Sequence, residues 1–248
     1  MRVLAMEMLA TALVTLIFLA AQPRASGQNA ASTAKASAPV DLTGYWVAFV
    51  TEDWRFRMIT PRKGDYQPVP LSVEARKVAD AWDPAADEAS GNQCKAYGGA
   101  AIMRLAARFH ITWQDENTLR VESDYGMQTR LLHFDRSPSS SQSSSQSSGG
   151  ERTWQGYSKA EWDKPSSLKV TTTNLRPGYL RKNGVPYSEN AAVTEYFDIA
   201  PIPGGGQVLL VTGIVDDPQY LRQPFTTSSQ FKKEADGSKW DPTPCSVK

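Results

Sequence analysis

The stretch from Phe109 to Phe134, FHITWQDENTLRVESDYGMQTRLLHF, decides the fold. Polar and apolar residues alternate within it in three runs, at Phe109 to Trp113, Thr118 to Ser123 and Met127 to Phe134. A period of two residues is the pattern of a strand that buries one face. Asp115-Glu116-Asn117 and Asp124-Tyr125-Gly126 separate the runs and have the composition of hairpin turns. The stretch therefore predicts a three-stranded antiparallel meander.

The same alternation recurs on both sides of this meander. We expect further strands at Thr43 to Val50, Trp54 to Ile59, Arg152 to Trp162, Leu168 to Asn174, Ala192 to Ile199, Gln207 to Val215 and Phe225 to Lys233. One helix interrupts them, with Ser72 as a suitable N-cap and Asp83-Pro84 at its end. We predict an all-β protein, an antiparallel up-and-down β-barrel of about 8–10 strands with one short helix. A β-sandwich is the alternative.

Alternation also assigns faces on the expected strand Trp54 to Ile59. It places Trp54, Phe56 and Met58 on one face and Arg55 and Arg57 on the other. The plain interpretation of such a pattern is that the aromatic side chains are core and the arginines face water.

The N-terminus has the plan of a secretory signal peptide. Arg2 precedes an apolar run from Leu9 to Ala21, which is shorter than the ~20 residues that a transmembrane helix needs. Cleavage is expected after about Ala21 or, better, after Gly27, because small residues precede both positions. We therefore expect a periplasmic or secreted protein without a membrane span.

Composition divides the rest of the chain. After a signal peptide at residues 1–27, the Ala/Ser/Thr-rich residues 28–40 are expected to be a flexible tether. Residues 41–248 are expected to form a single β-barrel domain. Ser137 to Gly150, SPSSSQSSSQSSGG, is of low complexity and is expected to be a disordered loop within that domain. A linker between two domains is the alternative.

The charge of the exported chain limits its partners. Loss of Met1 to Gly27 removes two basic residues and one acidic residue, so the formal net charge falls from +1 to zero. Nucleic acids and anionic membranes need a basic face. We expect neither as a partner, and the sequence leaves the oligomeric state unknown.

The two cysteines, Cys94 and Cys245, are expected to form one disulfide, because exported proteins fold in an oxidising compartment. Two separate buried thiols are the alternative. The bridge would close a loop on the order of 150 residues, which the chain-entropy model values at about 5 kcal/mol.

A longer pattern runs from Asp41 to Cys245. Its parts are Cys94 with Gly98-Gly99, Ile111-x-Trp113, Gln128-Thr129-Arg130, Trp154 to Ser158, Leu168 to Asn174, Gly184 to Ser188, Thr194 to Phe197, Asp217-Pro218-x-Tyr220, Pro224-Phe225 and Cys245. The pattern resembles a family of exported bacterial β-rich proteins, and this resemblance implies no particular reaction.

A shorter motif, Gly44-Tyr45-Trp46, is similar to the G-x-W that opens lipocalin and calycin barrels. In those families the tryptophan closes the barrel floor and a basic residue of the last strand packs over it. Here Lys232 and Lys233 take the place of that basic residue.

Signals for catalysis are poor. His110 and His133 fall on the first and third strands of the meander, about 10 Å apart at ~4.8 Å per strand step, which is too far to share a metal ion. Ser166-x-x-Lys169 and Ser229-x-x-Lys232 match a nucleophile motif that works on a helix, whereas a strand sends such residues to opposite faces. Asp217 is expected to cap a turn. We predict no catalytic residue, metal or cofactor.

Four residues are the candidate ligand-binding site. Gln128 and Arg130 project to one side of their strand, and Trp154 and Tyr157 come from the next, so the four are expected to line a pocket mouth for an anionic or aromatic molecule. We thus expect a non-catalytic barrel that binds a small amphipathic or anionic molecule. One alternative is a cofactor-free hydratase, isomerase or cyclase with Tyr157 or Glu195 as acid or base. Another is a structural or surface-interaction protein with a filled core.

Overall fold

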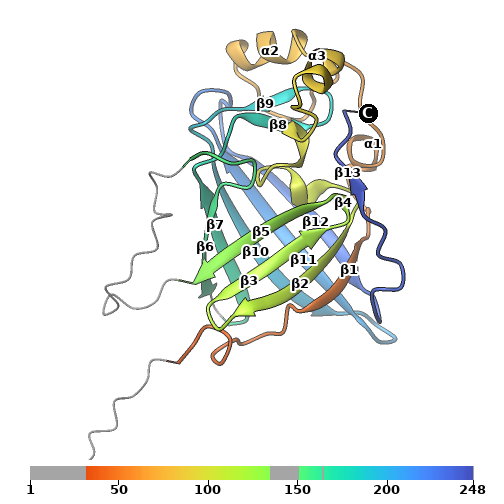
Figure 1. Cartoon of the computed structure of the whole chain (residues 1–248), viewed down its shortest axis with the longest axis vertical. Coiled ribbons are helices and arrows are strands. Elements are labelled where there is room, and N and C mark those ends of the chain that lie inside the picture. The colour runs from red at the N-terminus through yellow and green to blue at the C-terminus, as the bar shows by residue number, and fades with distance from the viewer. Residues whose placement is uncertain (1–31, 135–150, 164, 248) are drawn as a thin grey trace, which may run out of the picture. The chain divides into compact units, whose positions relative to one another are not determined.

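The expected meander is present as three antiparallel strands, β2 (Arg108–Asp115), β3 (Thr118–Ser123) and β5 (Gln128–Phe134) (Figure 1). They belong to a computed structural model that describes residues 32–134, 151–163 and 165–247. Alternate side chains such as Phe109, Val121 and Leu132 are buried on one face of the meander. Burial of this apolar face is the main force that orders the three strands.

Nine strands close into a barrel in the order β1-β12-β11-β10-β7-β6-β5-β3-β2. The other six are β1 (Gly44–Ala48), β6 (Tyr157–Asp163), β7 (Ser167–Thr173), β10 (Ala192–Pro201), β11 (Gln207–Asp216) and β12 (Phe225–Lys233). The predicted mostly-β fold and barrel are confirmed, and the sandwich alternative is wrong.

The predicted up-and-down topology is wrong at one junction. β5 and β6 run parallel, with Leu132 beside Ser158 and Phe134 beside Ala160, whereas all other neighbours in the barrel are antiparallel. A parallel pair cannot be joined by a hairpin turn. The chain between Phe134 and Tyr157 is therefore a crossover connection, and the barrel is mixed.

The barrel interior is filled with large apolar side chains. Trp46, Phe109, Phe197 and Phe231 are all at most 1% exposed. The Trp46 indole donates to the Leu42 carbonyl at 2.9 Å, and Lys233 Nζ lies 5.0 Å from the centre of the Trp46 ring. A basic residue of the last barrel strand thus packs over this tryptophan.

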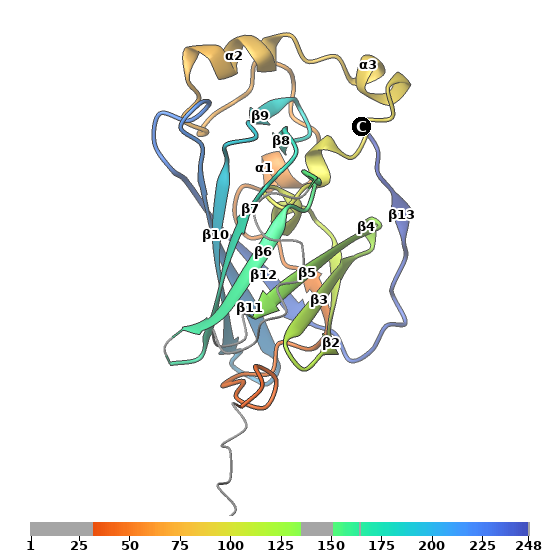
Figure 2. The same cartoon turned by 60° about the vertical axis from the view of Figure 1, so that its left-hand side comes forward.

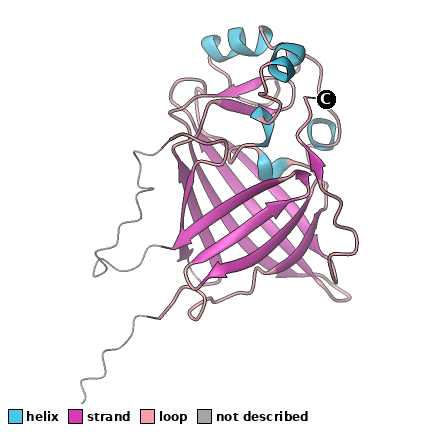
Figure 3. Ribbon diagram, viewed as in Figure 1, coloured by secondary structure: helices cyan, strands magenta, loops and turns pink. Residues whose placement is uncertain are grey.

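A cap covers one end of the barrel. We use this name for α1 (Trp54–Arg57), α2 (Val73–Asp80), α3 (Pro84–Ala89), the 3-10 helices η1 (Lys95–Tyr97) and η2 (Ile102–Arg104), and the hairpin of β8 (Gly178–Arg181) and β9 (Val185–Tyr187). Figure 3 shows that the helices gather at this end. One short helix was expected, so most of the cap is missing from the prediction.

The expected helix and its N-cap are present. Ser72 Oγ accepts a hydrogen bond from the backbone N–H of Ala75 at 3.1 Å, which begins α2. Asp83-Pro84 lies beyond the end of this helix and also begins the next one. The Asp83 carboxylate accepts from the N–H groups of Ala85 and Ala86 at 3.0 and 3.2 Å, and Pro84 occupies the first turn, where its missing N–H costs nothing.

The strand predicted at Trp54 to Ile59 is wrong. Asp53 adopts a left-handed backbone conformation with φ of 51°, and the chain then turns into α1. Six alternating residues are too few to distinguish a strand from a short helix. The expected faces are wrong for Arg57, which is buried, and for Trp54 and Met58, which are exposed, whereas Arg55 is exposed as expected.

Part of the predicted tether is packed against the barrel. The Ala34 N–H donates to Asn117 Oδ1 at 3.0 Å, and the Trp162 indole donates to the Ala34 carbonyl at 2.9 Å. Sequence composition alone missed these contacts. The predicted signal peptide at residues 1–27 and the Ser-rich loop at 137–150 lie outside the described residues. No described helix has the length and apolar character needed to cross a bilayer.

The C-terminal segment is tied to the cap, as the cysteines predict. Cys94 and Cys245 form a disulfide with a sequence separation of 151 residues. Just before Cys245, β13 (Thr243–Pro244) pairs in parallel with β4 (Tyr125–Gly126), and Figure 2 shows the two short strands. The bridge joins this pair to the start of η1, which lies in the cap.

Candidate functional site

The four residues of the predicted site do not face one pocket. The register between β5 and β6 sends Ser158 into the barrel beside Arg130, so Tyr157, one residue earlier, points outward. The Tyr157 ring stacks on His133 with centroids 5.2 Å apart. Trp154 lies in the loop before β6, where the Arg176 guanidinium covers its ring at 4.3 Å.

Arg130 is buried inside the barrel, next to an opposite charge and hydrogen-bond partners. Its guanidinium holds Glu195 through two hydrogen bonds of 2.6 and 3.2 Å, and Nη2 also lies within hydrogen-bond distance of Thr172 and Ser158. Such a bidentate pair neutralises both charges. The space beside Glu195 is only about 20 Å³, enough for about one water molecule. This cluster is closed and offers no free charge to a ligand.

Gln128 contacts the disulfide. Its amide donates to the Gly126 carbonyl at 2.7 Å and lies 3.4 Å from Cys245 Sγ, while its carbonyl accepts from Gln155 at 3.0 Å. These bonds hold the strand end, the bridge and the loop before β6 together.

A different set of arginines lines a cavity of about 160 Å³ in the cap. Its cationic lining consists of Arg57 of α1, Arg104 of η2, Arg181 of β8 and the following Lys182. Apolar residues, among them Phe56, complete the wall. The cavity therefore brings four basic side chains from three separate segments to one place. We call Arg57, Arg104 and Arg181 the arginine cluster.

Arg57 is a buried member of the arginine cluster, with a side chain only 1% exposed. Its Nε donates to the Arg104 carbonyl at 2.9 Å, and Nη1 lies 3.7 Å from Glu52, beyond hydrogen-bond distance. Neither Nη atom has a hydrogen-bond partner among the described residues. Burial, reinforced by the positive charge of Arg104, lowers the pKa of Arg57 to about 10.

Arg181 and Arg104 have similar surroundings. Arg181 Nη1 donates to the Gln67 carbonyl at 2.7 Å, and its guanidinium stacks 4.0 Å from the centre of the Phe56 ring. Arg104 Nη2 donates to Asp53 at 2.9 Å. Within the described part of the chain, Arg181 Nε and Nη2 and Arg104 Nη1 lack partners. Burial and the charge of Arg104 lower the pKa of Arg181 to about 10.

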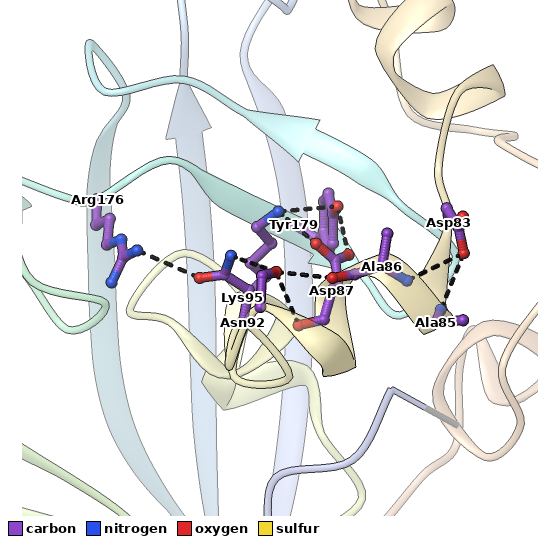
Figure 4. A network of polar contacts seen from close by, with 9 residues as sticks. Asp83, Ala85, Ala86, Asp87, Asn92, Lys95, Arg176 and Tyr179 are labelled. Atoms are coloured by element: carbon purple, nitrogen blue, oxygen red, sulfur yellow. Dashed lines mark hydrogen bonds and ion pairs between the residues drawn. The ribbon is translucent and has the colours of Figure 1, made fainter.

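A polar network holds β8, the strand that carries Arg181, against α3 and η1 (Figure 4). Asp87 of α3 is buried, accepts from the Tyr179 hydroxyl at 2.7 Å and forms an ion pair with Lys95 of η1. Tyr179 precedes Arg181 by two residues on β8. The network therefore fixes the strand from which Arg181 extends.

The turn after β8 is fixed by a glycine. Gly184 has φ of +81°, and a Cβ there would lie 2.3 Å from atoms of the Trp82 side chain. Only glycine fits this close approach without strain. The neighbouring Asn183 donates to the carbonyls of Arg62 and Asp65 at 3.1 and 3.0 Å, which anchors the turn to the segment after α1.

The arrangement is suited to binding an anion. Five guanidinium nitrogens of the arginine cluster have no hydrogen-bond partner in the described ranges. Glu52 and Asp53 offset part of its charge, and Asp65, which also acts on Arg181, is paired with Arg55. A buried cationic donor without a partner is costly, and an anion would supply the missing acceptors. Guanidinium groups match the geometry of carboxylate and phosphate groups. No described group of His, Cys, Asp and Glu is arranged to hold a metal ion.

Sequence reasoning missed the arginine cluster. Arg57 lies in the segment that was assigned to a strand with its arginines in water. Arg104 and Arg181 each stand within apolar neighbours, in Ile102-Met103-Arg104-Leu105 and Tyr179-Leu180-Arg181. A single arginine within an apolar run is a usable signal for a buried charge. It does not say which buried arginines come together.

Comparison of the chain with protein-family models, curated proteins and solved structures gave no match. The geometry therefore defines the class of protein, a closed mixed β-barrel of nine strands with an arginine-lined cavity in its cap.

Proposed function

We propose that this chain is an exported, non-catalytic β-barrel protein that binds a small organic anion in the cap cavity. The observation that supports this function is that Arg57, Arg104 and Arg181 line one cavity and together carry five guanidinium nitrogens without partners in the described residues. The proposal keeps the ligand class expected from the sequence. It moves the site from Arg130 to the arginine cluster.

The size of the cavity supports a small ligand. A cavity of about 150 Å³ accommodates a molecule such as benzene. The cap cavity, at about 160 Å³, has room for a carboxylate or phosphate with a few carbon atoms. Phe56 and the other apolar residues of the wall suit the carbon part of the ligand.

The two alternative functions have less support. The Glu195 carboxylate is occupied by Arg130, and Tyr157 lies on the outer wall of the barrel, so neither is placed to act on a ligand in the cap. A purely structural role agrees with the filled barrel interior. It gives no reason for two buried arginines and the partly buried Arg104 around an open cavity.

Calorimetric titration with benzoate and with phenyl phosphate tests this function. We expect one binding site in the wild-type protein and a loss of about 10- to 100-fold in affinity in Arg181→Gln, because one charge-assisted hydrogen bond contributes ~1.5–3 kcal/mol. Arg181→Lys keeps the positive charge but loses the planar guanidinium group, so its affinity should lie between those of the wild type and Arg181→Gln. Circular dichroism establishes that the variants are folded.

The matched control is Arg55→Gln. Arg55 carries the same charge on the same helix as Arg57, but it is exposed and paired with Asp65. Its replacement should leave the affinity within about twofold of the wild type. Equal affinities for the wild-type protein and a folded Arg181→Gln variant would rule out the cap site.

A further inference from the structure

The mouth of the cap cavity is bordered by exposed apolar side chains. Met58 and Ile59 line the cavity and are nevertheless 57% and 62% exposed, so they lie where the cavity meets solvent. Trp54, 63% exposed, stands four residues before Met58, and the chain is helical between them. Residues four apart on a helix share a face, which puts Trp54 in line with Met58.

The clustering of these side chains points to a ligand. Seven large apolar side chains are exposed among the described residues, and three of them fall between Trp54 and Ile59. Scattered exposed apolar residues need no explanation, but a group beside a cavity is typical of a binding surface. This group is continuous with the segment that supplies the buried Arg57 to the cavity wall.

Polarity changes along the path into the cavity. The inner wall carries guanidinium donors that need an anion, and the rim carries apolar side chains that lose water contact when a hydrocarbon covers them. A small inorganic anion would satisfy only the inner wall. A neutral lipid would satisfy only the rim. The molecule that matches both has a charged head and an apolar chain.

We propose that the ligand is a single-chain anionic amphiphile, with its carboxylate, sulfate or phosphate head on Arg57, Arg104 and Arg181 and its hydrocarbon chain along Met58, Ile59 and Trp54. This inference rests on the proposed function and names the ligand class of the same site. The cavity volume admits one head group and the first carbons of one chain, and the rest of the chain lies on the rim.

The test is a chain-length series of n-alkyl carboxylates, acetate, hexanoate, octanoate and decanoate, each titrated below its critical micelle concentration. Affinity should rise by about fourfold for each methylene that is buried, and decanamide, which lacks the charge, should bind far more weakly. In the Met58→Ser/Ile59→Ser double variant, the rise with chain length should flatten while the affinity for acetate stays within about twofold. Met127→Ser, an equally exposed apolar residue elsewhere, is the control and should change nothing.

The outcomes separate this inference from the proposed function. Binding of phenyl phosphate and acetate without any gain from chain length overturns the amphiphile and leaves the anion site standing. Absence of binding by every anion in the wild-type protein overturns both. A third outcome is that the wild-type protein sediments with phosphatidylglycerol vesicles, Trp54→Ser does not, and decanoate does not bind. That outcome would show that the partner is a bilayer surface, and it would also overturn the inference.

Discussion

Arginine has two opposite roles in this protein. Arg130 is buried against Glu195, which neutralises its charge within the barrel. Arg57 and Arg181 are also buried, yet two nitrogens of each guanidinium have no acceptor in the described structure, whereas only Nε of Arg130 lacks one. The difference lies in the partners and not in the exposure, and it separates a structural ion pair from a candidate binding site.

The Arg130–Glu195 pair should behave as a structural unit. Arg130→Met leaves the Glu195 carboxylate buried and unpaired, so we expect a loss of about 3–5 kcal/mol in the free energy of unfolding, measured in urea. A double variant, Arg130→Met/Glu195→Met, should recover much of that loss because no lone charge remains. Benzoate affinity should be unchanged in every folded variant. A loss below about 1 kcal/mol in the single variant would show that water or rearrangement satisfies Glu195.

Binding in the cap should depend on pH at the alkaline end. The pKa values of Arg57 and Arg181 are about 10 in the folded protein, below the ordinary value of 12.5, so both are charged at neutral pH and lose protons as the pH rises through about 10. Affinity for benzenesulfonate, whose charge is constant, should be flat from pH 7 to 9 and fall above that range. Affinity that persists unchanged at pH 11, with the fold intact, would contradict these charges.

At the scale of elements, strands that bury one face could be predicted and the cap could not. β2, β3 and β5 follow from alternation because each packs one side on the core. In α1, packing is set by the arginine cluster, so a charged residue is buried and Trp54 is exposed, which inverts the usual pattern. Tertiary context, which no local window contains, decides such a segment.

The candidate site could not be predicted for the same reason. Arg130 was expected to line a pocket mouth, but it is buried against Glu195, which is on a strand distant in sequence. Tyr157 was assigned to the wrong face, since its orientation depends on a parallel register that the sequence does not reveal.

The disulfide should hold the C-terminal segment in place. Cys245→Ser removes the tie between this segment and η1, and a disulfide typically contributes about 2–4 kcal/mol to stability. Urea unfolding of Cys245→Ser, Cys94→Ser and the double variant should give the same loss, because all three lack one bridge. Additive losses would mean that each cysteine contributes separately.

The connection between β5 and β6 must have a minimum length. Since the two strands are parallel, a tight turn cannot join them, and such crossovers need about a dozen residues or more. Replacement of Ser137–Gly150 by a ten-residue Gly/Ser linker should leave the melting temperature nearly unchanged. Replacement by a two-residue turn should lower it markedly. Equal melting temperatures for the two replacements would argue against the parallel pairing.

At the scale of the whole described chain, the barrel and the cap have different roles. The barrel has a filled interior, so it serves as the support, and the cap contains the cavity. Two apolar clusters reflect this division. One fills the barrel, and the other joins residues of β10, β11 and β12 to α2, β8 and β9. The second cluster packs α2, β8 and β9 of the cap against the barrel.

The most direct test of the cap site is an anomalous diffraction map from a crystal soaked in selenate, a tetrahedral divalent anion that can be located without ambiguity. We predict a selenium peak between Arg57, Arg104 and Arg181, with selenate oxygens within hydrogen-bond distance of the guanidinium nitrogens that lack partners in the described structure. The peak should disappear in Arg181→Gln and persist in Arg55→Gln. Selenate bound only at the surface or beside Arg130, with no peak in the cap cavity at the same concentration, would contradict the account.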